Sequence, residues 1–342
     1  MTPKAKQPPT GRTRRLTMAT SFDVERGAVR TLEAKDVQAQ LQGFARSTRV
    51  KFDAYDATLS LDGADLSYHS ADPALAESLA SFVPAIKGDE AGSFHTRLEH
   101  FDLCLEDSWT GKLVAETVLA SKVKDRLTIL HLDDHTDMMP TLLSVESELA
   151  DPINEMQRFD PTCPSDWDEA IRSGVIGIGS FMTALYELPL ELDVRHLCHN
   201  RDASRDTLSV IASTQRHPLL PDVEFSSVDK VTGLHASRLG TYTASTSSAD
   251  LVRRGQNGPM IVHVDLDYFI NDFNGNIGQR PAGSVKESQA RALSLLDELF
   301  SALRASGVTV ERWIIATSPG FCAARHWTML ISELRQRIAA AS

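Results

Sequence analysis

Two short stretches, far apart in the chain, carry side chains of the kinds that bind metal ions. The first reads LTILHLDDHTD (127–137) and the second reads MIVHVDLDYFIND (260–272). The ligand-type residues are Asp133, His135 and Asp137 in the first stretch, and Asp265 and Asp267 in the second. A strand turns alternate side chains to one face, so each set can converge on one point if the backbone stays extended. Oxygen donors with a single imidazole favour an ion such as Mn²⁺ over a sulfur-bound zinc.

The simpler interpretation of these residues is local structure. A single Asp after a strand usually caps a helix or forms a turn, and a lone His more often packs or hydrogen-bonds than ligates. Four carboxylates brought together without a cation would repel one another strongly, however. Two acidic clusters that close two apolar strands therefore predict a metal site.

Two further features near these stretches have two interpretations each. His131 and His263 both precede an Asp by two residues on the same strand face, so they either support the metal ligands by hydrogen bonds or are core histidines. The run VIGIGS (175–180) resembles a phosphate loop only weakly, because the full GxGxxG spacing and a Walker lysine are missing. Close backbone packing at a strand-to-helix turn explains it better.

The segments around both stretches alternate between strand and helix patterns. Strands are predicted over 101–105, 127–132, 192–197, 208–212, 260–269 and 310–317, and helices over 112–121, 166–173, 181–187, 284–307 and 324–339. This rhythm indicates right-handed βαβ crossovers and a mostly parallel sheet, so we expect a three-layer α/β/α fold. In such sheets ligands gather beyond the carboxyl ends of the strands, where both acidic clusters fall.

The rest of the chain gives weaker patterns. Residues 1–20 are basic and polar and predict a flexible tail, and 21–91 predict an α+β appendage before the main domain at 92–342. Within the appendage we expect a hairpin of strands 50–60 and 65–69 around Asp62-Gly63, and a helix over 73–83. The segment 218–248, dense in Ser and Thr, reads as a loop.

Composition limits the class of protein. The chain has 342 residues, 42% of them hydrophobic and 24% charged, as is ordinary for a globular protein. Its net charge of −11 argues against nucleic acid as a partner and suits a cationic one. Four dispersed cysteines without a CxxC pair fit a reducing compartment. No apolar run is long enough for a membrane span and the basic N-terminus lacks the apolar segment of a secretory signal, so we expect a cytoplasmic protein without a membrane partner.

The two acidic motifs together resemble those of a known family. Asp133-Asp134-His135-Thr136-Asp137 is similar to the D-A-H-x-D motif of the arginase/deacetylase superfamily, and Asp265-Leu266-Asp267 to its later D-x-D motif. HVDLDYFIND, IGIGSFMTAL and ATSPGF resemble a divergent branch that includes the peptide arginases. The resemblance covers roughly residue 95 to the C-terminus and implies an arginase-like fold there.

The resemblance also implies a chemistry. Asp133 and Asp265 would bridge two manganese ions, His135 and Asp267 would ligate one of them, and Asp137 the other. A hydroxide held between two cations is a strong nucleophile near neutral pH. The implied reaction is hydrolysis of a guanidino C–N bond, in which an arginine side chain, free or in a peptide, yields ornithine and urea.

The chain departs from the family pattern at one ligand. Ser108 stands where the family has a histidine, which predicts weaker binding of the first ion. His95, His100 or Asp107 are the nearby residues that could take its place. Two alternatives to arginase-like hydrolysis also remain: a single-metal amide hydrolase or deacetylase, and a non-catalytic binding protein that kept the fold.

Besides metal ligands, the implied hydrolysis needs an acid that binds the guanidinium and a group that transfers protons. His199 is the candidate proton shuttle, with a plain polar role in a loop as the alternative. Acids lie near the motifs at Glu146, Glu148, Asp160 and Asp272. We take Glu146 as the candidate catalytic acid and Asp272 as the candidate guanidinium-binding residue, because a guanidinium presents a planar fork of donors to a carboxylate.

Overall fold

The structure is a computed structural model of the chain. It describes residues 14–24, 48–52, 57–82, 92–121, 123, 125–146, 157–200, 206–253, 258–281 and 283–341. Among the sequence-derived candidates, Glu148 lies outside these residues. No helix within these ranges is both long and apolar enough to cross a bilayer.

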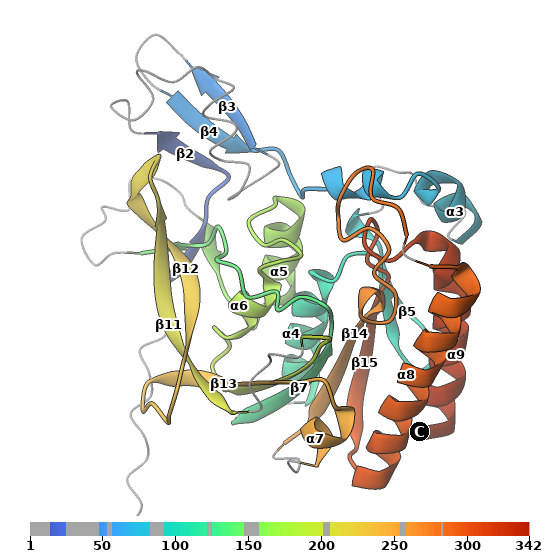
Figure 1. Cartoon of the computed structure of the whole chain (residues 1–342). Coiled ribbons are helices and arrows are strands. Elements are labelled where there is room, and N and C mark those ends of the chain that lie inside the picture. Colours follow the sequence, from blue (N-terminus) through green and yellow to red (C-terminus); the bar gives the residue numbers. More distant parts are fainter. Residues whose placement is uncertain are drawn as a thin grey trace, which may run out of the picture.

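A central sheet of 12 strands organises the described part of the chain (Figure 1). In spatial order the strands are β5 (His95–Arg97), β6 (Asp102–Cys104), β15 (Val310–Ala316), β14 (Met260–Asp265), β7 (Arg126–Leu132), β10 (Glu191–Leu197), β13 (Arg238–Ser245), β11 (Leu208–His217), β12 (Leu220–Val231), β8 (Ser144–Val145), β1 (Leu16–Met18) and β9 (Gln157–Phe159). The strands from β6 to β13 pair in parallel, and the outer pairs are antiparallel. This arrangement confirms the predicted α/β class with a mostly parallel core.

Helices cover both faces of the parallel strands. They are α3 (Leu75–Phe82), α4 (Trp109–Ser121), α5 (Pro164–Arg172), α6 (Phe181–Leu185), α7 (Ser248–Val252), α8 (Val285–Ser306) and α9 (Trp327–Ala341). One apolar core joins α4, α5 and α6 to alternate residues of the strands, including Ile129 and Ile261. A second core joins α8 and α9 to the intervening residues, including Leu130 and Val262. Three layers result, as predicted.

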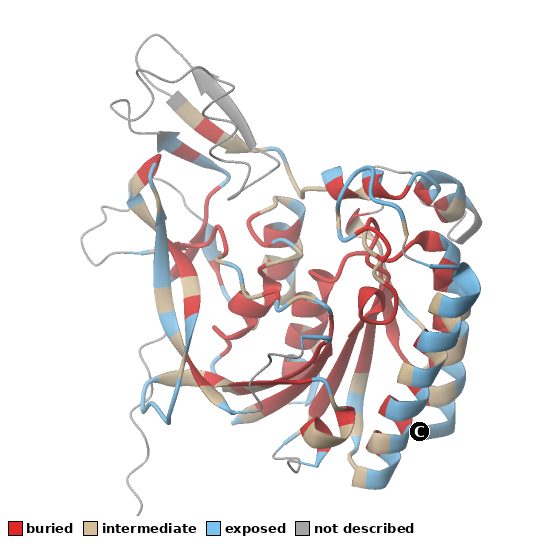
Figure 2. Cartoon of the chain, in the orientation of Figure 1, coloured by how far each residue is buried: buried red, intermediate tan, exposed pale blue. Residues whose placement is uncertain are grey.

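The local sequence explains why the central elements form where they do. Every residue of β14, and every residue of β7 after the first, is buried, as a strand covered on both faces requires (Figure 2). Helix α8 begins with the predicted capping box, in which Ser284 and Glu287 each bond to the other's backbone N–H. It ends at Gly307, whose φ of 65° lies in the left-handed region.

The segment predicted as a loop over 218–248 is instead largely strand. β12 pairs antiparallel with β11, and β13 pairs with both β11 and β10. β-Branched Thr and Val suit strands, but much of β11 and β12 is only partly buried, so these residues lack a clear apolar alternation. The prediction is wrong because a high density of Ser and Thr occurs both in loops and in partly exposed strands such as β11 and β12.

The N-terminal region also differs from the prediction. Leu16–Met18 forms β1 inside the central sheet, with all three residues buried, so a flexible tail to residue 20 is wrong for residues 14–20. The appendage holds a separate sheet of β2 (Ser21–Val24), β4 (Ala57–Leu61) and β3 (Thr48–Phe52). The hairpin pairs β3 with β4, and the segment predicted as its second strand ends in a 3₁₀ turn, η1 (Ser67–Ala71).

We predict that Gly111→Ala destabilises the fold. A Cβ at Gly111 would lie 2.0 Å from the Trp167 ring, and this ring is fully buried between α4 and α5. Overpacking of this kind costs about 1–3 kcal/mol or more, which exceeds the gain of about 1 kcal/mol in helix propensity. Denaturant unfolding measures the loss. Gly177→Ala is the matched control, because its Cβ would meet nothing within 4 Å; equal losses in both variants would contradict the packing argument.

Candidate metal centre

The two acidic stretches meet at the carboxyl ends of neighbouring strands. β7 and β14 pair in parallel with His131 opposite His263, so Asp133 and Asp265 leave the sheet side by side. His135 Nδ1 lies 3.0 Å from Asp267 Oδ2 and 3.4 Å from Asp133 Oδ1. Asp133, His135 and Asp267 each offer a ligand atom within 4.8 Å of the others. These residues can hold a metal ion, as the sequence predicted.

Turns, rather than extended backbone, bring the ligand groups together. Asp133 Oδ1 accepts a hydrogen bond of 2.6 Å from the backbone N–H of His135. Asp265 Oδ1 accepts one of 2.9 Å from Asp267 N, which caps the 3₁₀ turn η3 (Leu266–Tyr268). Asp137 has a φ of 51°. The predicted convergence is observed, but the predicted reason for it, alternation along a strand, applies only up to Leu132 and Asp265.

A second carboxylate group adjoins the first. Asp107, Asp133 and Asp265 also offer ligand atoms within 4.8 Å of one another, and all three are buried. Asp107 lies two residues before α4, next to Ser108. Of the three replacements considered for the histidine missing at Ser108, the structure brings Asp107 to the centre. His95 stacks on Trp109 at 4.4 Å instead, and His100 lies 3.8 Å from Glu99.

Several buried polar atoms at this centre have no hydrogen-bond partner among the described residues. They are Asp107 Oδ1, Asp133 Oδ2, Asp137 Oδ2, Asp267 Oδ2, His131 Nε2 and His263 Nε2. A buried polar atom without a partner costs about 1–3 kcal/mol, so six at one place need a common explanation. Carboxylate and imidazole atoms are also the usual ligands of divalent ions. The donor set therefore fits a bound cation.

The electrostatics of the carboxylates agree with this fit. Burial is the main cause, and repulsion from Asp133 the second, of raised pKa values at three carboxylates. The pKa of Asp107 and that of Asp137 lie well above the usual value, and the pKa of Asp267 is raised to about 7. Burial and repulsion from Asp267 raise the pKa of Asp265 as well. For Asp133 burial acts in the same direction, but the hydrogen bond from His135 outweighs it and holds the pKa below its usual range. One ionised carboxylate thus stands among four that resist ionisation.

His135 carries the compensating charge when no metal is bound. Burial lowers its pKa, but hydrogen bonds and charge from Asp133 and Asp267 outweigh burial and raise the pKa to about 12. Its Nε2 lies 3.0 Å from Asn274 Oδ1, an acceptor, so Nε2 carries a hydrogen and Nδ1 faces the carboxylates. Asn274, with a φ of 47°, was missed from the sequence. The Asn274-Gly275 pair is a turn signal, but turn chemistry does not reveal which distant residue it orients.

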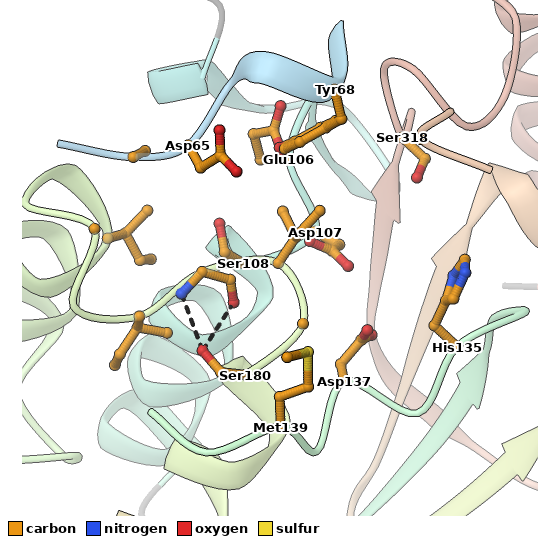
Figure 3. A pocket seen from close by; sticks show the side chains of 18 of the residues that line it. Asp65, Tyr68, Glu106, Asp107, Ser108, His135, Asp137, Met139, Ser180 and Ser318 are labelled. Atoms are coloured by element: carbon orange, nitrogen blue, oxygen red, sulfur yellow. Dashed lines mark hydrogen bonds between the residues drawn. The ribbon is translucent and has the colours of Figure 1, made fainter. Parts of the chain in front are cut away.

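A cavity of about 560 Å³ opens above the ligand groups (Figure 3). Its wall carries five acids: Asp65, Glu106, Asp107, Asp137 and Asp265. His135 is the only basic side chain among the lining residues. The cavity therefore favours a cationic or metal-bound ligand. The wall also includes residues 177–180, where a Cβ on Gly179 would lie 2.9 Å from Met139 Sδ, so the predicted close packing is found at Gly179.

Two close backbone approaches fix the N-terminal segment over this cavity. A Cβ on Gly174 would lie 2.2 Å from the carbonyl oxygen of Gly63, and one on Gly320 would lie 2.2 Å from that of Tyr68. Both glycines also have φ near 80°. Between these contacts, Tyr68 donates its hydroxyl hydrogen to Glu106, and the His69 ring also bonds to Glu106. The segment that gave no chemical motif thus supplies Asp65 and Tyr68 to the wall.

The other candidate residues lie away from the cavity. Glu146 is exposed, and its Oε2 lies 3.8 Å from Arg15 Nη1, next to the paired strands β8 and β1. His199 Nε2 bonds to the Tyr268 carbonyl at 2.6 Å, and its ring stacks on that of Tyr268. Asp272 is buried, and its Oδ2 lies 3.2 Å from both Arg325 Nη2 and His326 Nε2. Their proposed roles need a cavity residue, and the cavity acids that are not candidate metal ligands are Asp65 and Glu106.

Comparisons with known proteins add nothing to the geometry, since no protein-family model matches the chain and no curated protein matches it. The function therefore has to be argued from the site.

We predict that the affinity for Mn²⁺ rises with pH. Metal ligands must be deprotonated, and the raised pKa values of Asp267 (about 7) and His135 (about 12) mean that both hold protons in the metal-free protein at about pH 6. Binding releases these protons, so the affinity increases about tenfold per pH unit for each proton released.

Calorimetry between about pH 5.5 and pH 7.5, in two buffers of different ionisation enthalpy, counts the protons directly. In Asp267→Asn the pH dependence should become shallower by up to one proton. An affinity for Mn²⁺ that stays constant over this range contradicts the protonation scheme.

Proposed function

We propose that the chain is a divalent-metal-dependent hydrolase that cleaves a guanidino C–N bond, converting an arginine side chain to ornithine with release of urea. The observation that carries the proposal is the convergence of ligand atoms from Asp133, His135, Asp267, Asp107 and Asp265. Three of these residues, His135, Asp107 and Asp265, also line an acidic cavity. A binding module without chemistry has no need for so many buried carboxylates, because each is costly to ionise there.

Two manganese ions are the proposed cofactors. Asp133 belongs to both ligand groups and is the natural shared ligand, with His135 and Asp267 on one side and Asp107 and Asp265 on the other. When bound, such ions would supply an activated water molecule and stabilise negative charge that develops during hydrolysis. The resemblance of the two motifs to those of the arginases supports this assignment.

The chain's own residues would bind and orient the substrate. A guanidinium is planar and always charged, and its donors match carboxylate oxygens. Asp65 and Glu106 line the cavity above the ligand groups, and Tyr68 and His69 already orient Glu106 by hydrogen bonds. The acidic wall therefore attracts the cation and holds it next to the metal ligands. Hydrolysis then converts a permanent cation into a primary amine and neutral urea.

The size of the cavity bears on the substrate. About 560 Å³ lies within the range of sites that enclose a drug-sized ligand, so an arginine with neighbouring peptide groups is compatible with it. The surface of the molecule agrees, since the net charge of −11 favours encounter with cationic peptides.

The direct test is urea release from free arginine and from an arginine-containing peptide, with and without Mn²⁺. We expect Mn²⁺-dependent urea release by the wild-type chain. Asp267→Ala should lower kcat by more than about 100-fold, because loss of residues that merely support metal ligands already costs 10–100-fold. Asp134→Ala is the matched control. Asp134 lies in the same acidic run but is exposed and bonds to Asn271, so urea release should stay within about twofold.

Other outcomes point to the competing functions. One zinc ion per chain with turnover of acetyl-lysine, and no urea, would replace the proposal with an amide hydrolase. A chain that binds no divalent ion, and in which Asp133→Asn changes no partner binding, would instead be a non-catalytic protein that kept the fold.

A further inference from the structure

Three histidines lie side by side beneath the carboxylates. His196 on β10, His131 on β7 and His263 on β14 occupy one register across three adjacent parallel strands. The His131 ring lies 4.9 Å from that of His196 and 5.0 Å from that of His263. All three side chains are buried. A row of buried imidazoles in the core needs a chemical reason, because each ring brings two polar nitrogen atoms with it.

The hydrogen bonds distinguish His196 from the other two histidines. Both nitrogens of His196 have partners, since Nδ1 lies 2.7 Å from the Tyr242 hydroxyl and Nε2 lies 3.0 Å from the Asp133 carbonyl oxygen. His131 and His263 share one hydrogen bond of 2.8 Å between their Nδ1 atoms. Nε2 of each has no hydrogen-bond partner among the described residues. His196 is therefore explained as a structural residue, and the other two are not.

The free nitrogen of His131 points at the carboxylates. His131 Nε2 lies 3.4 Å from Asp137 Oδ2 and 3.7 Å from Asp133 Oδ2. Both oxygens are themselves buried without a hydrogen-bond partner. Distances of this size separate atoms that bind the same ion, because ligands about 2.1 Å from a metal lie roughly 3–3.7 Å apart. His131, Asp133 and His263 also form a group whose ligand atoms lie within 4.8 Å of one another.

We propose that His131 supplies the imidazole ligand of an inner cation position, together with Asp133 and Asp137. This inference rests on the proposed metal-dependent function and specifies the ligands of its second ion. His263 is a positioning residue. It accepts the Nδ1 hydrogen of His131 across the 2.8 Å contact, which leaves the His131 Nε2 lone pair directed at the ion.

The assignment explains the departure at Ser108. The imidazole that the arginase pattern places before α4 comes here from strand β7, two residues before Asp133. His131 and His135 then lie on either side of Asp133 in the sequence HLDDH. Each ion receives one imidazole, a share of Asp133 and at least one further carboxylate, which is Asp137 for the inner ion and Asp267 for the outer. Asp107 and Asp265 complete the oxygen donors around the inner ion.

The ligands of the inner position also favour some metal ions over others. Its imidazole and carboxylate ligands favour divalent transition metals such as Mn²⁺, Co²⁺ or Zn²⁺ over Mg²⁺ and Ca²⁺, which prefer oxygen ligands alone. Access is through the cavity, because Asp137 lines it while His131 is fully buried behind.

Co²⁺ binding to the full chain tests the inference without an activity assay. We expect two Co²⁺ ions per wild-type chain, measured by elemental analysis after removal of excess metal. His131→Gln should lower the inner-ion affinity by at least about 100-fold and leave one ion, held by His135 and Asp267. Asp267→Asn should also leave one ion, but with a different visible Co²⁺ spectrum. His263→Gln should weaken the inner ion by about 10–100-fold.

His196→Gln is the matched control. It removes an equally buried imidazole from the same row, and it should keep both ions. If His131→Gln keeps both ions at unchanged affinity while urea release persists, the inference fails and the proposed function stands. If His131→Gln loses one ion from a chain that releases no urea, the inference holds and the proposed function fails. A wild-type chain that binds no Co²⁺ overturns both.

X-ray absorption on the zinc-loaded wild-type chain avoids dependence on variants that unfold. The ligand set predicts an average of one imidazole per ion, from His131 and His135. An average of one imidazole for every two ions would leave His135 as the only histidine ligand and would overturn the inference.

Discussion

Parallel pairing of β7 with β14 is the constraint on which the rest of the site depends. The register that sets His131 opposite His263 also sends Asp133 and Asp265 out of the sheet on the same face. A slip of one residue would turn one of these carboxylates to the opposite face, toward α8 and α9. The register is held by two apolar cores that use alternate residues of both strands. Burial on both faces thus fixes the position of polar groups that contribute nothing to either core.

The buried carboxylates at this centre lower the stability of the metal-free fold. Asp107, Asp137, Asp265 and Asp267 have raised pKa values because burial and mutual repulsion disfavour their ionised forms. Without a cation, protons and the His135 imidazolium must neutralise the cluster. A divalent ion replaces those protons with a charge that all the ligands share, so binding and folding stability are linked. The same linkage explains why several buried polar atoms without hydrogen-bond partners gather at this centre.

The sequence was informative where structure is local or repeats with a fixed period. It predicted the buried strands β7 and β14, the α8 capping box of Ser284 and Glu287, and the two acidic clusters, because each depends on residues within a few positions of one another. It failed for β12 and β13, whose pairing depends on distant β11 and β10. It could not place Asp65 or Tyr68, because backbone contacts to Gly174 and Gly320 bring them to the cavity. Glu146, His199 and Asp272 are near the motifs in sequence but point to other partners.

The carboxylate centre and the rest of the cavity wall are built from different kinds of segment, so they can change independently. The half that we propose binds metal is built mainly from strand ends, where a buried register leaves little freedom. The half that we propose binds substrate lies on other segments, which line the cavity with residues such as Asp65, Tyr68, Asn274 and Phe321. Glu106 joins the two halves, because it directly precedes Asp107 and accepts hydrogen bonds from Tyr68 and His69. A substitution in residues 64–68 would alter the charge and shape of the wall without moving a metal ligand. If the proposed function holds, substrate preference can therefore vary on this fold while the carboxylate centre stays in place.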